Sequence, residues 1–122
     1  MGDQAIARFF FAGFVRLHVL YHAAKDAVFG AEIAEELQRH GYRVSQGTLY
    51  PTLHQLERLG YLASRVEFVA GRRRRYYRAT PAGRKVLASA RTRLQELVGE
   101  ILQDRDAEFQ SIRRKHRTAR KE

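Results

Sequence analysis

The chain has 122 residues, and 23 lysines and arginines against 13 aspartates and glutamates leave a formal charge of +10. That length suits one domain, and an apolar content of 44% with 7 Phe and 6 Tyr excludes a largely disordered chain. No cysteine is present, which excludes disulfides, thiol nucleophiles and cysteine-bound metals, while the positive charge favours nucleic acid as partner.

The first predicted element is a helix from about Gln4 to Lys25, where apolar side chains recur at helical spacing. They are Ile6, Phe9, Phe10, Phe14, Leu17, Leu20 and Tyr21. Other apolar residues surround most of this helix, which predicts cover by a second subunit. The apolar run at residues 9–15 is too short to span a bilayer, and no secretory signal is recognisable. We therefore expect a cytoplasmic protein.

Two short helices are predicted next, joined by a tight connection. The first spans about Ala31–His40 and ends before a glycine. The second spans about Gln46–Leu59 and follows Ser45, a favourable N-cap residue. Because Pro51 lies inside this segment, we expect the regular helix either to start near Thr48 or to bend at the proline.

A β-hairpin is predicted after these helices. The stretch 61–69 alternates with period two. Three apolar residues share one face of it, namely Leu62, Val66 and Phe68. An Ala-Gly turn follows, and residues 76–78 return as the second strand. This prediction places the four consecutive arginines, 72–75, at the tip of the hairpin.

A long helix is predicted after the hairpin, with Thr80 as N-cap and Pro81 at the first helical position. Leu87, Ala90, Leu94, Leu97 and Ile101 form a seam like that of a coiled coil. Because no later segment offers cover for this seam, we expect a homodimer. Residues 105–122 carry 7 basic and 3 acidic residues with little apolar periodicity, so we expect the end of the chain to be a solvated basic tail.

The predicted fold class is mostly α with a small β-hairpin. A pair of short helices followed by a basic hairpin indicates a winged helix-turn-helix, extended by a long C-terminal dimerisation helix. We expect residues 1–80 to form the DNA-binding domain, 81–109 the dimerisation helix and 110–122 a disordered tail. The dimerisation residues are predicted to be Phe10, Phe14, Leu87, Leu94, Leu97 and Ile101.

The second short helix is the candidate recognition helix. Its leucines at positions 49, 53 and 56 define the buried stripe, so the remaining faces are free for DNA. The arginines of the hairpin are expected to bind phosphates, because a tip lacks packing partners, and the helix is expected to select the sequence. The predicted DNA-binding residues are Ser45, Gln46, Thr48, Tyr50, Pro51, Gln55, Arg72, Arg73, Arg74 and Arg75.

Four motifs resemble the PadR-like transcriptional regulators. They are G-x-x-I at 30–33, S-Q-G-T-L-Y-P at 45–51, L-x-x-L-G-Y-L at 56–62 and R-R-Y-Y-R-A-T-P-A-G-R at 74–84. The resemblance covers about residues 14–102 and is closest to the short-tailed subgroup. It implies a dimeric winged-helix regulator, usually a repressor, which binds duplex DNA at an inverted repeat and is often released by a small ligand.

A site for such a ligand is predicted from aromatic residues. The chain has no Trp, and Phe109 is the only aromatic residue near the end of the predicted C-terminal helix, so the aromatic pocket of some family members does not transfer residue by residue. Phe9, Phe10 and Phe14 of the first helix are the candidate effector residues, although a stripe of Phe at helical spacing is more commonly core.

Other classes of function fit the sequence less well than DNA binding. The five histidines show no catalytic or zinc-binding motif, so we expect neither an enzyme nor a cofactor. His18 and His22 have the i, i+4 spacing of metal ligands, but no third ligand is evident, and no metal is predicted. The remaining alternative is a basic module that binds RNA or an acidic protein.

Overall fold

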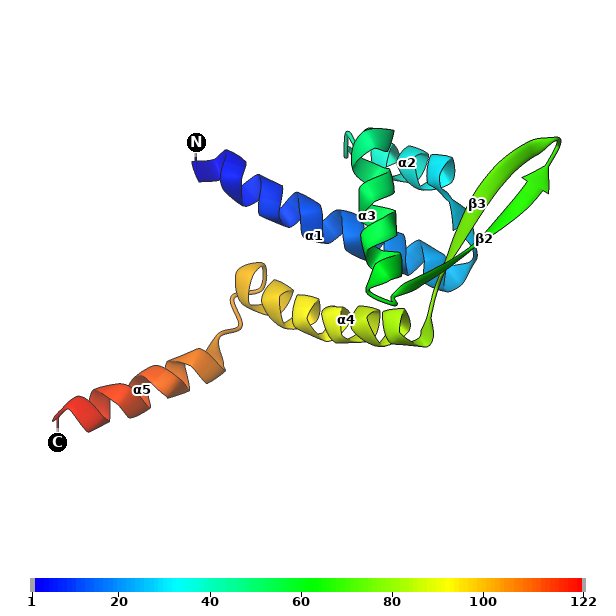
Figure 1. The fold of residues 1–122 in the computed structure, drawn as a ribbon. Helices are drawn as coiled ribbons and strands as arrows, with labels where there is room; N and C mark the ends of the chain where they lie inside the picture. Colours follow the sequence, from blue (N-terminus) through cyan, green and yellow to red (C-terminus); the bar gives the residue numbers. More distant parts are fainter. Residues whose placement is uncertain (1, 122) are drawn as a thin grey trace. The chain divides into compact units, whose positions relative to one another are not determined.

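The computed structural model describes residues 2–121, with the side chains of residues 4–119. Within this range it contains five helices and three strands (Figure 1). They are α1 (Gly2–Lys25), β1 (Val28–Phe29), α2 (Gly30–Arg39), α3 (Gln46–Arg58), β2 (Leu62–Val69), β3 (Arg72–Ala79), α4 (Pro81–Ile101) and α5 (Ala107–Lys121). The chain divides into two compact units, one ending at Ala88 and one beginning at Ser89. The winged-helix architecture predicted from the sequence is confirmed.

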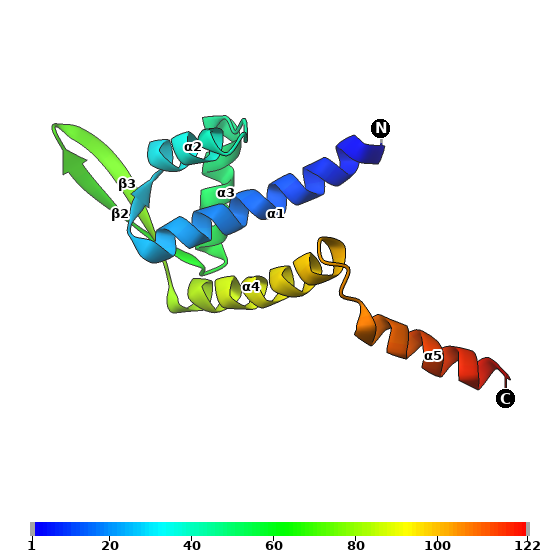
Figure 2. The same ribbon diagram turned by 180° about the vertical axis from the view of Figure 1, so that it is seen from behind.

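The core of the first unit lies where α1, α2, α3 and the sheet meet. Seen from behind, α1 crosses in front of α3, and the hairpin extends away from the helices (Figure 2). The most deeply buried side chains include Val19 of α1, Leu37 of α2, Leu53 of α3 and Tyr77 of β3. The helical periodicity therefore identified the inward faces of α2 and α3. On α1 it was right only in part, because Leu20 is buried but Phe9 and Phe10 of the predicted stripe are exposed, and the buried Val19 was not in that stripe.

Helix α3 begins at Gln46 and contains Pro51. The proline has no amide hydrogen, so the carbonyl of Gly47 lacks its usual helical donor. Both residues lie on the exposed side of the first turns, where water can reach that carbonyl. Of the two alternatives, the late start near Thr48 is wrong, because the helix already begins at Gln46.

The sheet contains a strand that the sequence did not predict. The strand order is β1-β3-β2, and β1 pairs with β3 at Val28–Tyr77 and Phe29–Tyr76. Two residues are too few to give a period-two signal, and this pairing bridges about fifty residues of sequence. β1 gives β3 a second neighbour near the base of the hairpin.

The hairpin is longer than predicted. Ala70 (φ 51°) and Gly71 (φ 76°) both have positive φ, as a two-residue turn matching the twist of the strands requires. β3 therefore starts at Arg72 rather than at residue 76, and the arginines lie along a strand rather than at a tip. The distal half of the hairpin extends beyond the core. Phe68 is therefore 75% exposed, although Phe68 shares a face of β2 with the buried Leu62.

The start of α4 is fixed by Thr80, as predicted. Its hydroxyl accepts a hydrogen bond from the amide of Gly83 (3.1 Å) and donates one to the carbonyl of Gly60 (2.5 Å). The first turns of α4 join the core, and Leu87 is buried there by its own chain. The sequence analysis expected Leu87 to lack cover within the chain, and that expectation is wrong, because Leu87 packs in the core of its own chain.

The second unit contains the rest of α4 and α5. α4 ends at Ile101 rather than near residue 109, and Asp104 follows in the left-handed conformation (φ 54°). The tail expected to be disordered from residue 110 lies in α5, whose start is held by hydrogen bonds from Gln110 to Asp106. α5 was missed because it has little apolar periodicity, but Ala, Arg, Lys and Gln are strong helix formers.

Gly83 provides a test of how α4 docks. A Cβ at this buried position would overlap the carbonyl oxygen of Tyr61, which is backbone and cannot rotate away. We expect Gly83→Ala to lower the free energy of unfolding by about 1–3 kcal/mol. Thermal denaturation followed by circular dichroism measures the change.

Gly47→Ala is the matched control. The nearest atom that a Cβ there would meet is the Ser45 hydroxyl oxygen at 3.7 Å, and alanine is the better helix former, so stability should rise by about 0.5–1 kcal/mol. Equal stability of Gly83→Ala and the parent chain would contradict this account of the docking.

Candidate nucleic-acid interface

The first turn of α3 is an exposed polar surface on a firmly held helix. Ser45 caps the helix, with its hydroxyl accepting a hydrogen bond from the Thr48 amide at 3.2 Å. Gln46, Thr48 and Tyr50 are exposed, whereas Leu49 and Leu53 are fully buried. Packing therefore fixes the rotation of α3 about its axis and leaves its polar side free to meet a ligand.

The side chain of Gln55 is less available to bind DNA than the sequence indicated. Its side-chain oxygen accepts two hydrogen bonds from the Arg16 guanidinium, at 2.8 and 3.2 Å. Arg16 comes from α1, so this contact joins the exposed face of α3 to another helix. Sequence reasoning missed Arg16, because no local pattern reports a contact between residues 39 positions apart.

The strand register divides the four arginines between the two faces of the hairpin. Arg73 lies opposite Phe68 and Arg75 opposite Val66, on the face that carries the buried Tyr77 nearer the base. Arg72 and Arg74 therefore lie on the other face, since successive side chains alternate. The arginines form two pairs with different surroundings rather than one basic cluster.

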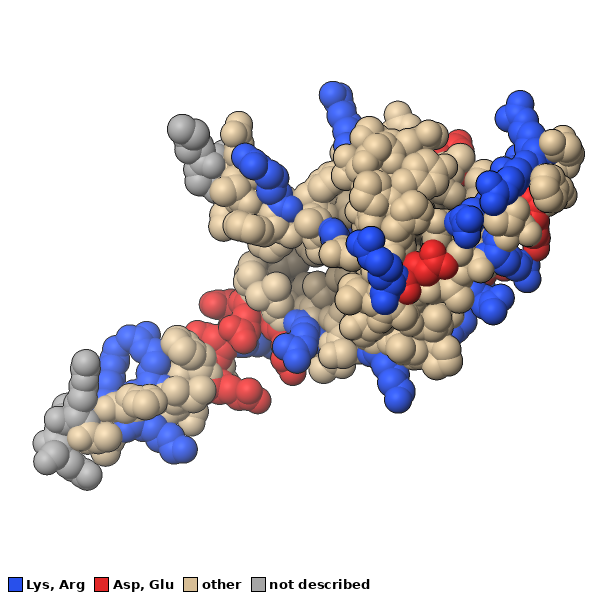
Figure 3. Space-filling model, viewed as in Figure 1, with Lys and Arg blue, Asp and Glu red and all other residues tan. Residues whose placement is uncertain are grey.

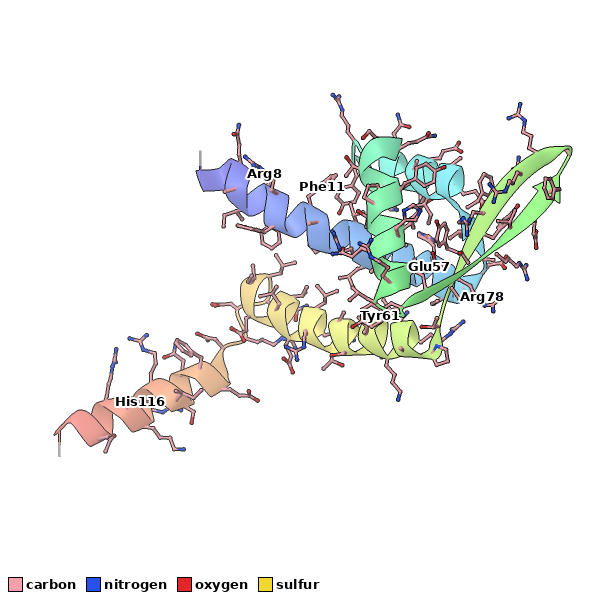
Figure 4. The ribbon with its side chains drawn as sticks, viewed as in Figure 1. Arg8, Phe11, Glu57, Tyr61, Arg78 and His116 are labelled. Carbon is pink, nitrogen blue, oxygen red and sulfur yellow. The ribbon has the colours of Figure 1, made fainter. Side chains whose placement is uncertain are left out.

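Two of the arginines have packing partners, which corrects the expectation that none would. The Arg74 guanidinium lies 4.5 Å from the centre of the Phe29 ring, a cation–π contact that the short strand β1 makes possible. Arg75 donates to the Ser64 hydroxyl at 3.1 Å, and Ser64 donates to the Glu57 carboxylate at 2.5 Å. Glu57 belongs to α3, where Figure 4 labels it, so these bonds connect the hairpin with the candidate recognition helix.

Of the four consecutive arginines, Arg72 and Arg73 remain available to bind a ligand. Within the described part of the chain neither has a hydrogen bond or an ion pair, and both are exposed. Arginines follow the hairpin in Figure 3, whereas the visible surface over α3 is mainly uncharged. The two exposed arginines of β3 are thus separate from the exposed face of α3, which is neutral and can form hydrogen bonds.

The three candidate effector residues form an exposed apolar surface on α1. Phe9 is 77% exposed, and the Phe10 and Phe14 rings stack with their centres 5.8 Å apart. All three lie outside the core, so the alternative in which this stripe was core is wrong for the single chain.

The histidine pair on α1 has more neighbours than the sequence suggested. The His18 ring lies 5.0 Å from that of His40 and 6.4 Å from that of His22, measured between ring centres. The Glu36 carboxylate contacts His40 Nε2 at 2.9 Å and His22 Nε2 at 3.6 Å. Even so, no three His, Asp or Glu side chains in the described range are arranged to hold a metal ion.

Ionisation within this cluster follows from its contacts. A hydrogen bond from Arg39 at 2.7 Å is the main reason that the pKa of Glu36 falls to about 2. Burial lowers the pKa of His18, and the neighbouring His40 and His22 lower it further. These surroundings favour the neutral form of His18, while the Glu36 carboxylate acts in the opposite direction.

Comparison with known proteins identifies relatives of this chain. Residues 19–89 match the sequence model of the Transcriptional regulator PadR-like family. Transcriptional regulator Rv3488 of Mycobacterium tuberculosis is 60% identical over 88 residues, which cover 72% of this chain and 82% of that protein.

Solved structures of other proteins also resemble this chain. The protein smu.1704 from Streptococcus mutans is 28% identical, with a TM-score of 0.70 over 78% of this chain and 92% of its own. A PadR family transcriptional regulator from Eggerthella lenta is also 28% identical, with a TM-score of 0.69 over 82% and 91% of the two chains. None of the helices within residues 2–121 has the length and hydropathy needed to cross a membrane.

We expect His18 to make the stability of the fold depend on pH. Because the pKa of His18 is lower in the folded chain than its ordinary 6.5, the unfolded chain takes up this proton more readily. The stability contributed by neutral His18 should be complete above about pH 6.5 and lost as the pH falls through the folded pKa. When the pH is lowered from 7.5 to 5.5, we expect the melting temperature of His18→Gln to fall less than that of the parent.

His116→Gln, on the exposed face of α5, serves as control and should follow the parent chain. Parallel pH curves for His18→Gln and the parent would show that His18 does not carry the effect.

Proposed function

The chain belongs to the PadR-like family of transcriptional regulators, and from this premise we propose that it is a sequence-specific DNA-binding repressor that acts as a homodimer. The observation that carries the proposal is the exposed polar start of α3 beside an arginine-rich hairpin that is hydrogen-bonded to the same helix. This combination matches the recognition helix and wing of winged helix-turn-helix proteins.

The two elements are proposed to have different roles. Gln46, Thr48 and Tyr50 can enter the major groove, where side-chain amides and hydroxyls read base edges. Arg72 and Arg73 are free to bind phosphates, which gives affinity without sequence choice. Ser45 and Pro51 shape the start of α3, and Gln55 reaches DNA only if its bond to Arg16 opens or is shared.

The homodimer is proposed from apolar surface that a single chain leaves in water. On α4, Leu97 is 46% exposed and Ile101 is 67% exposed, while Leu94 is half-buried. On α1, Phe10 and Phe14 are also exposed. A repeating apolar seam on a helix is typical of a helix that pairs with a second copy. A two-fold dimer would read an inverted repeat with half-sites about one helical turn apart.

A small-molecule effector is proposed to act at Phe9, Phe10 and Phe14. A phenylalanine surface can bind a flat apolar compound only where something closes over it, and the partner subunit would supply that cover. The alternative functions, binding of RNA or of an acidic protein, have less support. Tyr77, one of the two tyrosines available for stacking on bases, is buried.

Selection of bound sequences from random duplex DNA tests the proposed function directly. We expect an enriched inverted repeat, bound more tightly than random duplex or structured RNA at the same salt concentration. Equal affinity for duplex DNA and RNA would reject a sequence-specific transcription factor.

Substitutions on the two DNA elements should change binding in different ways. Arg72→Ala with Arg73→Ala should weaken operator and random DNA alike and reduce the slope of log K against log salt by about 0.9 for each phosphate that is no longer bound. Thr48→Ala should instead narrow the difference between operator and random DNA by about 1–3 kcal/mol while the salt slope stays constant. Titrations by fluorescence anisotropy at several salt concentrations measure both quantities.

Arg74→Ala with Arg75→Ala is the matched control for the free pair, because it removes the same charge. These arginines also contact Phe29 and Ser64, so their removal should lower the melting temperature, which the first double variant should not. An unchanged salt slope in the Arg72 and Arg73 variant would contradict their role as phosphate ligands.

The dimer is tested by polar substitution on α4. Leu94→Gln with Leu97→Gln should dissociate or unfold the protein, because each leucine that the dimer buries contributes on the order of 2 kcal/mol. Light scattering should give about twice the mass of one chain for the parent. Gln95→Glu changes an exposed polar residue on the same helix and should keep the parent mass. A parent chain that scatters as a monomer at micromolar concentration would overturn the dimer.

A further inference from the structure

Phe68 is a large apolar side chain that the fold leaves in water. It is 75% exposed, and it lies two residues before the turn at Ala70 and Gly71. We propose that Phe68 is a wedge that enters the minor groove of duplex DNA beside the site read by α3 and separates two stacked base pairs. This inference rests on the proposed function and assigns a further residue to it.

The strand register places Phe68 on the side of the hairpin that faces α3. Side chains alternate along β2, so Ser64 and Phe68 share one face, and Ser64 donates a hydrogen bond to Glu57 of α3. Tyr77, across the ladder from Ser64, is buried against the core on this face. A duplex bound along α3 would therefore meet the face of the hairpin that carries Phe68.

The neighbours of Phe68 favour a nucleic acid over an apolar protein surface. Arg73 lies directly opposite Phe68, and Arg75 lies opposite Val66, which is itself 36% exposed. A protein partner covering Phe68 would also have to bury Arg73, a cation without an ion pair within the described residues, at a large desolvation cost. In a minor groove the phosphates on either side neutralise arginine while the groove interior accepts an apolar ring.

The hairpin is held firmly enough to present a wedge. The bonds from Arg75 to Ser64 and on to Glu57 fix its base to α3, and Arg74 lies over the Phe29 ring on the opposite face. A two-residue turn closes the ladder directly beyond Val69, so the strands stay paired up to the tip. Little conformational freedom would be lost when Phe68 enters the groove.

An inserted ring has a consequence for the DNA sequence. Separating a base step costs energy, and the cost is lowest at flexible pyrimidine–purine steps such as TA and CA. We expect the selected duplexes to contain such a step outside the bases that α3 contacts. The duplex should bend at this step when the protein binds.

The test uses the full-length protein and a selected operator carrying 2-aminopurine at the flanking step, because this base becomes more fluorescent when it is unstacked. The parent should raise the fluorescence. Phe68→Ala should abolish the rise and weaken operator binding on the order of 10-fold with an unchanged salt slope. Phe68→Leu, which keeps an apolar wedge, should retain most of both effects.

Val69→Ala is the matched control, because it shortens an apolar side chain on the opposite face of the same strand, and it should behave as the parent. The wedge is wrong if Phe68→Ala keeps the parent affinity and fluorescence while the Arg72 and Arg73 variant still shows a reduced salt slope. It is also wrong if Phe68→Ala lowers the melting temperature or the oligomeric mass, since either result assigns Phe68 to protein packing. Failure of the parent chain to prefer duplex DNA would instead reject the proposed function itself.

Discussion

The burial of the leucine stripe of α3 is the constraint on which the rest of the first unit depends. Leu49 and Leu53 are fully buried and Leu56 nearly so, and they contact side chains of the other helices and the sheet in a single core. Because a helix has one rotation that buries such a stripe, the polar residues of the first turn must point outward. The surface proposed to read DNA is thus a consequence of the hydrophobic core.

The hairpin depends on the same helix through polar contacts. Its distal half has no core beneath it, so its direction relies on the base, where β1 pairs with β3 and Ser64 bonds to Glu57. The contacts of Arg74 and Arg75 belong to this base, whereas Arg72 and Arg73 lie beyond it. A run of four identical residues therefore contains two that support the hairpin and two that are exposed and have no hydrogen bond or ion pair within the described residues.

Long-range contacts explain which parts of the candidate site escaped prediction. The bond between Arg16 and Gln55 and the contact between Arg74 and Phe29 each join residues about forty or more positions apart. None of these four residues carries a local sequence signal for its distant partner. The exposure of Phe68 was missed for a related reason, because period-two alternation reports that two residues share a face but not whether a core lies beneath that face.

The sequence by itself determined the helices α1 to α3, the caps at Ser45 and Thr80, the turn of the hairpin and the family, because each depends on neighbours within a few residues or on a contiguous motif. The tertiary structure alone decided that β1 joins the sheet, that Leu87 is buried by its own chain, and that the arginines divide between two faces. The helix at residues 107–121 is instead a local feature that apolar periodicity did not indicate, because it rests on strong helix formers rather than on an apolar stripe. The difference is physical. Local patterns fix the backbone conformation of a segment and gave the inward faces of α2 and α3. On a helix as apolar as α1, which face is buried, and how far, depends on the core that the other segments bring to it.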